Sequence, residues 1–472
     1  MKRHKRIYLL LGVLAVICIA TIIVRGIEEK KEKIKNSDKI ILQVPSDLVK
    51  TLSWEYKSNS LSFHKDGKWI YDKDEAFPVS EKKIKEFLQQ FENFGVTFII
   101  EDVEDYGQYG LDKPICTIKF STEEKSYEVK LGDFSTMDSQ RYVSIGDGNV
   151  YLVKNDPLEY FNATLSEMIN HDTTPIFTKV SVKEIKFTGA EDYNIIYEKD
   201  SVHTYNKEDI YFAQQSGKKL PLDTTKVNDY LNSISYLNLT DYVSYNATAD
   251  ELKKCGLDSP ELKITVNYSS ENEEGKESSD TFVLNVSRDP EQKKAAKDSD
   301  DKNKDDSEKE DIIAYARVGE SKIIYKIPSD SYKKLMAASY DSLRHSEVLA
   351  TAFENINKFD ITLESKEYTI NTEKKDDKRI YTYKDKEIEI TDLQNAFSNL
   401  KAESFTKNKP TEKEEISLTV YLDDENFPKI KLQFYRYDGS HCIAVVDGES
   451  VSLIKRSNVV DLIEAVNAII LN

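Results

Sequence analysis

The chain reads Gly-Leu-Asp-Lys-Pro at residues 110–114 and Gly-Leu-Asp-Ser-Pro at residues 256–260. Each copy is followed at once by alternating apolar and polar residues, over 116–120 after the first copy and over 262–266 after the second. This alternation predicts a strand with one buried face. Because the turn and the strand recur together, the sequence predicts a structural module that is repeated along the chain.

Three stretches carry apolar residues at positions i, i+3, i+4 and i+7, a spacing that forms one stripe along a helix. The three sets are Ile84, Phe87, Leu88 and Phe91; Val227, Tyr230, Leu231 and Ile234; and Leu393, Ala396, Phe397 and Leu400. We expect Ser80, Asp223 and Thr391, which precede these sets, to be N-caps, because their side-chain oxygens can accept an unpaired backbone N–H. The third set indicates a third copy of the module, in which residues 407–410 replace the Gly-Leu-Asp turn.

Each copy also contains a predicted hairpin followed by a short helix. The hairpin strands are expected at 142–146 with 150–153, at 315–319 with 323–327, and at 442–445 with 451–454. Asp447-Gly448 in the third hairpin suits a tight primed turn, and a further hairpin around Asp66-Gly67 opens the first copy. The closing helices are expected at 157–161, 328–335 and 457–470. Strand runs that alternate with single helices predict an α+β fold, with helices packed on antiparallel sheets.

The predicted organisation is an N-terminal transmembrane helix followed by three tandem α+β modules. The expected segments are a tail and anchor at 1–26, a charged stalk at 27–39, and modules at 40–175, 176–348 and 349–472, the last of which is the most diverged. The second module carries an insert at 288–310, rich in Asp, Glu and Lys. We expect this insert to be disordered, because it has too few apolar residues to offset the entropy of ordering the chain.

Residues 7–24 are uncharged and mostly apolar, and the length of this run is near the lower limit for crossing a bilayer. A cleaved signal peptide is the alternative, but the run is longer than the usual ~7–15 residues and no small-x-small site precedes Arg25. Basic residues flank the run on both sides, so charge counting gives nearly a tie for orientation. We expect the short tail in the cytoplasm and the large C-terminal region outside the cell membrane.

The composition excludes some partners. Acidic residues outnumber basic residues 84 to 66, and the net charge is −18, so the chain lacks the concentrated basic surface that nucleic acids require. None of the four cysteines forms a Cys-x-x-Cys pair that could bind zinc. Lipidation of Cys18 is not expected, because Ile17 before it is large.

Several features together resemble a known family. They are the anchor, the hairpin with Trp69, the amphipathic helix, the Tyr-Gly-Leu-Asp-x-Pro turn at 109–114, and a strand that ends in Leu131-Gly132. The chain in these respects resembles the bacterial domain-of-unknown-function family 4340, over 40–175 and the second module and more weakly over the third. Members are often encoded beside ABC transporter subunits related to those of gliding-motility systems. The resemblance implies an accessory role at the cell envelope and no catalytic residues.

The chemistry-bearing residues favour structural roles. The six histidines are His4, His64, His171, His203, His345 and His441, and no two have the His-x-x-x-His spacing of a helical metal site. His171 and His345 follow the first two modules at similar positions, so a paired site is the alternative for these two. Asp112 and Asp258 are expected to cap their own turns. Trp54 and Trp69 are expected in the first core, and stacking on a sugar or peptide is the alternative.

The sequence therefore predicts a non-enzymatic, membrane-anchored extracytoplasmic protein without catalytic, cofactor-binding or metal-binding residues. We expect an accessory or scaffold component of an ABC transporter system, whose partners are the lipid bilayer, through residues 7–24, and transporter membrane subunits. The alternative is a stand-alone protein that binds the cell wall or another surface ligand. A third hypothesis, an envelope hydrolase, requires a cluster of accessible titratable residues in one cleft.

Overall fold

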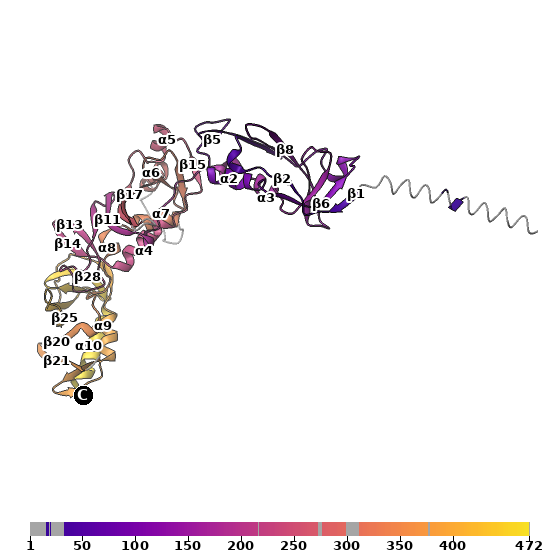
Figure 1. The fold of residues 1–472 in the computed structure, drawn as a ribbon. Helices are drawn as coiled ribbons and strands as arrows, with labels where there is room; N and C mark the ends of the chain where they lie inside the picture. The colour runs from indigo at the N-terminus through magenta and orange to yellow at the C-terminus, as the bar shows by residue number, and fades with distance from the viewer. Residues whose placement is uncertain are drawn as a thin grey trace, which may run out of the picture. The chain divides into compact units, whose positions relative to one another are not determined.

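The computed structural model describes Val16, Ile17, Ile19 and residues 33–215, 217–271, 276–298, 311–375 and 378–471. The chain forms two compact units, Met1–His171 and Asp172–Asn472. Three antiparallel sheets, one in the first unit and two in the second, contain most of the strands (Figure 1). The expected α+β fold of three tandem sheet modules is thus confirmed.

The second sheet shows the arrangement of one complete module. Its strands are β11 (Ser181–Gly189), β12 (Tyr193–Tyr197), β13 (Tyr211–Gln215), β14 (Lys218–Pro221), β15 (Tyr242–Ser244), β16 (Leu262–Glu271), β17 (Glu277–Arg288), β18 (Ala314–Val318) and β19 (Ile324–Ile327). They lie in the order β14-β13-β12-β11-β16-β17-β18-β19-β15, and all neighbours are antiparallel. Two meanders therefore meet at the pair β11 and β16, and β15 closes the far edge.

The third sheet repeats this arrangement strand for strand. Its strands are β20 (Ile356–Leu363), β21 (Lys366–Lys375), β22 (Lys378–Tyr383), β23 (Lys386–Glu387), β24 (Ala402–Phe405), β25 (Glu414–Leu422), β26 (Lys429–Arg436), β27 (His441–Val446) and β28 (Glu449–Lys455). Their order is β23-β22-β21-β20-β25-β26-β27-β28-β24. The divergence of this copy in sequence has therefore not changed its topology.

The first sheet has the same topology with one strand missing and two added. Its strands are β1 (Lys33–Asn36), β2 (Ile40–Leu42), β3 (Thr51–Tyr56), β4 (Asn59–Asp66), β5 (Lys68–Tyr71), β6 (Phe94–Glu101), β7 (Cys116–Ser121), β8 (Ser126–Ser135), β9 (Gln140–Ser144) and β10 (Val150–Val153). The order is β1-β6-β10-β9-β8-β7-β3-β4-β5, and β2 also pairs with β6. The equivalent of β14 is absent after β5.

The predicted stalk at 27–39 is too long. Residues 33–36 form β1, which pairs with β6 in the register of Lys33 with Glu101. The reason is that β6 is the edge strand of its meander, and its free backbone groups are satisfied by adding a further strand. Residues 27–32 lie outside the described part of the chain.

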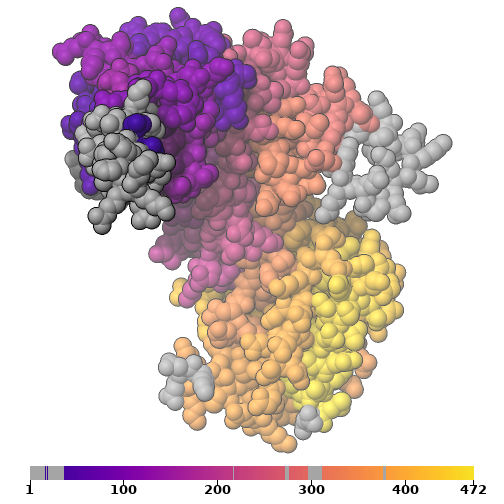
Figure 2. Space-filling model, turned by 90° about the vertical axis from the view of Figure 1, so that its right-hand side faces the viewer, coloured from indigo at the N-terminus to yellow at the C-terminus, as the bar shows by residue number. Residues whose placement is uncertain are grey.

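Helices cover the sheets. They are α2 (Glu81–Gln89), α3 (Leu158–Phe161), α4 (Thr224–Ser235), α5 (Ala249–Lys254), α6 (Pro290–Asp298), α7 (Ser329–Met336), α8 (Tyr340–Leu343), α9 (Thr391–Ser398) and α10 (Arg456–Leu471). Short 3-10 turns lie at Ser46–Leu48, Tyr106–Tyr109, Leu165–Met168, Phe177–Lys179 and Phe353–Asn355. In the third module α9 and α10 lie side by side against the sheet (Figure 1). The early residues of this module, in orange, and its yellow C-terminal residues form one continuous body (Figure 2).

The three predicted apolar stripes lie on α2, α4 and α9, except that Phe91 and Leu400 follow the ends of α2 and α9, and every residue of the stripes is buried. Two of the three predicted N-caps are confirmed: Ser80 accepts a hydrogen bond from Lys83 N–H, and Asp223 accepts from the N–H groups of Thr225 and Lys226. The prediction for Thr391 is wrong. Helix α9 begins at Thr391 itself, so this residue already lies in the first turn.

Trp54 on β3 is the centre of the first core. It is 1 % exposed, and its ring lies 5.5–5.6 Å from the rings of Phe63, Phe87 and Phe161. These contacts join β4, α2 and α3 to the sheet, and aromatic pairs at such distances add to the free energy of burial. Trp69 is buried as well. Neither ring is therefore available to stack on a ligand.

The Gly-Leu-Asp turns reverse the chain after a helical turn and then pack on the sheet. Gly110 and Gly256 adopt φ values of +69° and +68°, a left-handed conformation that glycine adopts without steric cost. Leu111 is buried against β9 and β10, and Leu257 against the equivalent strands β18 and β19. The repeated motif thus marks the same small apolar cluster in two modules.

The base of the 288–310 insert is ordered, contrary to the prediction. Helix α6 begins after Asp289, whose carboxylate accepts from the N–H groups of Glu291 and Gln292. The Gln292 side chain bonds to Asp311 O at 2.8 Å and to Ile313 N at 3.0 Å, so it ties α6 to the returning chain. Local capping and these bonds compensate for the lack of apolar residues. Residues 299–310 lie outside the described part.

No helix within the described residues is long and apolar enough to cross a bilayer. The predicted anchor at 7–24 falls outside that part of the chain, apart from Val16, Ile17 and Ile19.

Gly132→Ala is expected to destabilise the first unit by about 1–3 kcal/mol through overpacking. A Cβ at this position would lie 2.1 Å from Tyr109 O, in the turn that crosses β8. Urea unfolding followed by tryptophan fluorescence measures this effect, because both tryptophans of the chain belong to the first unit. Gly95→Ala is the matched control, since its Cβ would meet nothing closer than 4.0 Å. Equal unfolding midpoints for the two variants would contradict the packing argument.

Deletion of residues 299–310 should leave the melting temperature unchanged, whereas deletion of residues 290–310 should lower it by several degrees. The longer deletion removes α6, the two bonds of Gln292 and the ion pair between Lys293 and Glu261. Hydrogen bonds of this kind contribute about 0.5–1.5 kcal/mol each. Thermal melting followed by circular dichroism separates the two cases, and identical curves would show that α6 does not support the second module.

Candidate functional site

The structure separates the residues that the sequence analysis considered. Asp112 and Asp258 are exposed in their turns, and the Asp112 carboxylate accepts a hydrogen bond from Lys113 N–H at 2.9 Å. His64 pairs with Asp72, and both side chains are more than 40 % exposed. His345, in contrast, is 18 % exposed and lies in a cluster of polar side chains within the second unit. This cluster is the candidate site.

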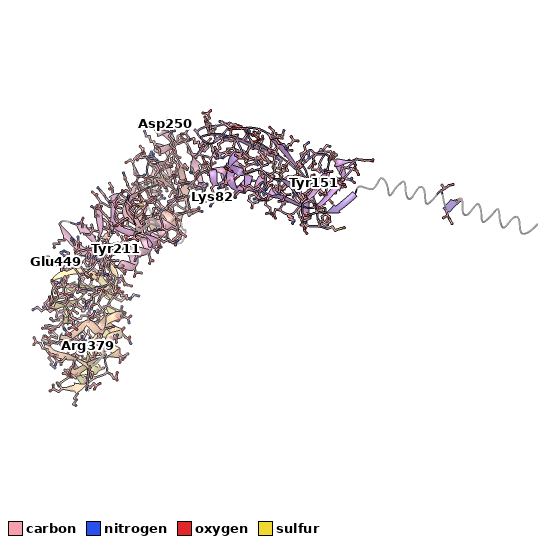
Figure 3. All side chains as sticks on the ribbon, in the orientation of Figure 1. Lys82, Tyr151, Tyr211, Asp250, Arg379 and Glu449 are labelled. Carbon is pink, nitrogen blue, oxygen red and sulfur yellow. The ribbon has the colours of Figure 1, made fainter. Side chains whose placement is uncertain are left out.

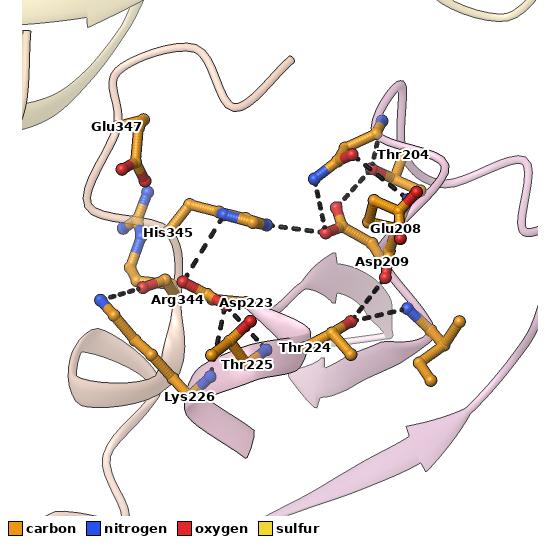
Figure 4. Close-up of polar contacts among 12 residues, drawn as sticks. Thr204, Glu208, Asp209, Asp223, Thr224, Thr225, Lys226, Arg344, His345 and Glu347 are labelled. Carbon is orange, nitrogen blue, oxygen red and sulfur yellow. Dashed lines mark hydrogen bonds and ion pairs between the residues drawn. The ribbon is translucent and has the colours of Figure 1, made fainter. Parts of the chain in front are cut away.

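Asp209 is the buried centre of the cluster. Its side chain is 2 % exposed and lies in the loop between β12 and β13. The carboxylate accepts hydrogen bonds from Thr204 Oγ1 at 2.7 Å, from Asn206 Nδ2 at 3.0 Å and from His345 Nε2 at 2.7 Å (Figure 4). A buried carboxylate needs such donors, because burial of an unpaired charge is costly. The loop therefore presents a fully bonded anion to His345.

Asp223 is the second carboxylate beside His345. Its Oδ2 lies 4.0 Å from His345 Nδ1, while its Oδ1 caps the N-terminus of α4. The backbone of Asp223 also donates a hydrogen bond to Leu343 O at 3.0 Å. The imidazole thus lies between one carboxylate from a loop and another from a helix cap (Figure 4).

The surroundings of His345 favour its charged form. Burial works against the charge, but the hydrogen bond to Asp209 and the negative charges of Asp209, Asp223 and Glu347 outweigh burial, so the pKa of His345 lies above its ordinary value. In the charged form both ring nitrogens carry a proton, and the ring can face both carboxylates.

The segment around His345 connects the second and third modules and is fastened to both. On the side of the second module, Lys226 Nζ donates to Arg344 O at 2.9 Å. On the side of the third module, Val348 N–H donates to Leu400 O at 2.9 Å, and Ala402 N–H donates to Ser346 O at 2.7 Å. Residues 346–348 therefore form a short antiparallel pair with the chain that enters β24.

Aromatic contacts reinforce this junction. The Arg344 guanidinium lies 4.9 Å from the ring of Tyr340 in the second module and 4.3 Å from that of Phe405 in the third. Tyr205 extends from the loop of Asp209 and packs edge-on against Phe427, with ring centroids 5.6 Å apart. Such cation–π and aromatic contacts stabilise partly buried surfaces. Both side chains thus bridge the two modules.

A cavity of about 140 Å³ lies beside the cluster. It is lined by Thr204, Tyr205, Asp209, Pro221, Tyr340, Arg344, His345, Glu347, Val348, Ala350, Val446 and Val451. Figure 3 labels two residues that are close to this lining in the sequence. Tyr211 comes two residues after Asp209, and Glu449 lies between Val446 and Val451. The volume corresponds to about four or five water molecules. It is too small for the substrates of most enzymes, whose sites measure about 300–1,000 Å³.

The hydrogen-bond pattern does not form a nucleophile with its base. The Thr204 hydroxyl donates to Asp209, so it is engaged away from His345 Nε2, the nitrogen that would act as its base. Across residues 33–471, outside the gaps at 216, 272–275, 299–310 and 376–377, no group of three or more His, Cys, Asp and Glu residues could hold a metal ion. The cluster fits an electrostatic link between the body of the second module and the segment at 344–348 that leads into the third.

Sequence reasoning identified His345 and Asp223 but gave them separate roles, and it missed Asp209. The signal that could have found the loop is the series Thr204, Asn206 and Asp209, polar residues spaced to bond one another in a turn. The suggested equivalence of His171 and His345 is offset by one residue. The N-cap residues of α2 and α4 make matching contacts, because Ser80 N–H donates to Met168 O and Asp223 N–H donates to Leu343 O. Met168 is therefore equivalent to Leu343, and this register aligns His345 with residue 170.

Comparison with known proteins identifies one similarity. Residues 69–290 match the family model described as "Domain of unknown function (DUF4340)". Neither a curated protein nor a solved structure matches the chain. The matched region contains Asp209 and Asp223 and ends before His345.

Asp209→Ala is expected to destabilise the second unit by on the order of 3 kcal/mol, because it leaves a buried imidazolium without its closest partner. It also leaves Thr204 Oγ1 and Asn206 Nδ2 without their acceptor. Chemical unfolding of the full chain followed by circular dichroism measures the change. Asp229→Ala, on the exposed face of α4, is the matched control and should have little effect. A similar small change for both variants would contradict the assignment of Asp209 as the centre of the junction.

Proposed function

Residues 69–290 place the chain in the DUF4340 family, and from this premise we propose that the protein is a membrane-anchored, non-enzymatic scaffold outside the cell membrane. Its role is that of an accessory component of an ABC transporter system. A single transmembrane helix at residues 7–24 holds it in the bilayer, and the sheet modules contact transporter membrane subunits.

The observation that carries the proposal is the threefold use of one sheet topology. The modules share one order of strands, and they differ in the edge strands of the first sheet and in their connecting loops. Repeated modules present extended surfaces to partners, a common property of scaffold proteins. The buried polar cluster around Asp209 belongs to the second module, and its groups are engaged in holding the segment at 344–348, which leads into the third module.

The short connection to the anchor supports a position close to the membrane. Eight residues, 25–32, separate the proposed span from β1. Even fully extended, this segment reaches about 28 Å. The first module is therefore held within reach of the extracytoplasmic loops of a neighbouring membrane protein. The acidic net charge of −18 keeps such a protein soluble at the membrane surface.

Cross-linking in native membranes, followed by affinity capture and mass spectrometry, tests the partner. The proposal predicts recovery of an ABC permease or ATPase with the tagged full chain. A chain whose residues 1–26 are replaced by an unrelated single-pass anchor is the control, and it should recover the same subunit if the modules make the contact. Recovery of the protein alone, or with cell-wall fragments, would contradict the transporter role and favour a stand-alone surface-binding protein.

Met137→Cys tests the orientation. Met137 is 93 % exposed in the loop between β8 and β9, whereas Cys116, Cys255 and Cys442 are buried. In intact cells a membrane-impermeant maleimide should label the variant and leave the parent chain unlabelled. Labelling that appears only after the membrane is permeabilised would place the modules in the cytoplasm and overturn this part of the proposal.

A further inference from the structure

We propose that the junction between the second and third modules is a proton-operated lock, in which charged His345, between Asp209 and Asp223, holds the connecting segment at 344–348 on the second module and so keeps the two modules in one relative orientation. Loss of the proton releases the modules to move about the segment at 344–348. This property concerns the second unit alone and does not depend on the proposed partner.

The charged groups that face His345 from the elements around it are acidic. Asp209 comes from the loop before β13, Asp223 from the cap of α4, and Glu347 from the connecting segment. The Glu347 carboxylate is also paired with Lys401 of the third module, at 3.1 Å. The third module otherwise contributes Ala350, Val446 and Val451 to the adjacent cavity, and none of these side chains titrates.

Nearby cations do not take the place of His345. The Arg344 guanidinium is directed at the rings of Tyr340 and Phe405. The Lys226 ammonium is bonded to a backbone carbonyl, Arg344 O. The positive charge at this point between the two carboxylates therefore depends on the protonation of one imidazole.

Deprotonation weakens the link in a definite direction. A neutral imidazole has one N–H, so it cannot donate toward both Asp209 and Asp223, and it no longer offsets their charges. Because the pKa of His345 is raised in the folded state, its stabilising contribution is fully present below the ordinary histidine pKa of about 6.5. The contribution is lost as the pH rises through the folded-state pKa. The lock is therefore closed at mildly acidic pH and open at alkaline pH.

The geometry explains why this change is transmitted to the modules. His345 stands between Arg344, whose carbonyl is held by the second module, and Ser346, whose carbonyl accepts from Ala402 N–H of the third. When its ion pairs weaken, the packing of Tyr205 on Phe427 and the short strand pair at 346–348 still connect the modules. The opened state is a looser junction in which both sheets remain folded.

Pulsed electron paramagnetic resonance on the full chain in nanodiscs tests the lock. Spin labels are attached at Lys263→Cys in β16 and Lys431→Cys in β26, two exposed positions in the second and third sheets, with Cys18→Ser to remove a competing thiol. We expect a single narrow distance distribution at pH 6 and a distribution at least twice as broad at pH 8.5. Equal widths at both pH values would overturn the proposal.

Two variants make the result specific. His345→Gln keeps an N–H donor for Asp209 but carries no charge, so its distribution should be broad at both pH values. His64→Gln is the matched control, because His64 pairs with Asp72 in the first unit and belongs to neither of the two modules. It should respond to pH like the parent chain. A pH response that survives in His345→Gln would contradict the lock.

A direct titration keeps the test decisive if a variant does not fold. The ¹³Cε1 signals of the histidines in the labelled parent chain give the pKa of each ring. The signal of His345 is assigned by elimination, with single His→Gln variants at the other positions, because the hydrogen bond to Asp438 raises the pKa of His441 as well. The midpoint of the broadening should coincide with the titration of this signal. A midpoint that differs by more than one pH unit would show that another group controls the junction.

Discussion

Each module depends on one central strand pair, in which the first strand of one meander pairs with the strand that follows the Gly-Leu-Asp region or its replacement. The pairs are β3 with β7, β11 with β16, and β20 with β25, with Leu52 opposite Phe120, Ile185 opposite Val266, and Phe359 opposite Val420. All six side chains are 2 % exposed or less. Without this pairing each sheet would separate into two meanders, neither of which encloses the core under the helices. The helices, turns and junction are all built on this frame.

The frame tolerates change at its edges. The first sheet lacks a counterpart of β14 and gains β1 and β2. The second module carries α6 at the base of its insert, and the third replaces the Gly-Leu-Asp turn. Edge strands and loops contact fewer buried side chains than the central strands, so these positions can vary at little cost. The functional differences between the modules are therefore expected at the edges and loops, and the junction cluster follows this rule, because Asp209 lies in a loop.

Periodic features of the sequence predicted most of the fold. The stripe that begins at Ile84 and the alternation after Gly110 depend on local geometry, and the structure contains the helix and strand that they indicate. The errors have physical reasons. Thr391 was misplaced because an N-cap depends on backbone angles at one residue, and α6 was missed because its stability comes from Gln292 and contacts distant in sequence. The junction could not be predicted, because Asp209 and His345 are 136 residues apart and neither belongs to a periodic pattern.

The proposed action of this protein is by contact, through repeated sheet modules held close to the membrane. Site-specific photo-cross-linking in living cells tests it most directly, with a photoreactive amino acid placed in turn at Met137, Tyr236 and Tyr437, an exposed position in each module. We expect a covalent adduct with an ABC transporter subunit from at least one of the three positions. Adducts with cell-wall material alone, or no protein adduct from any of the three, would contradict it.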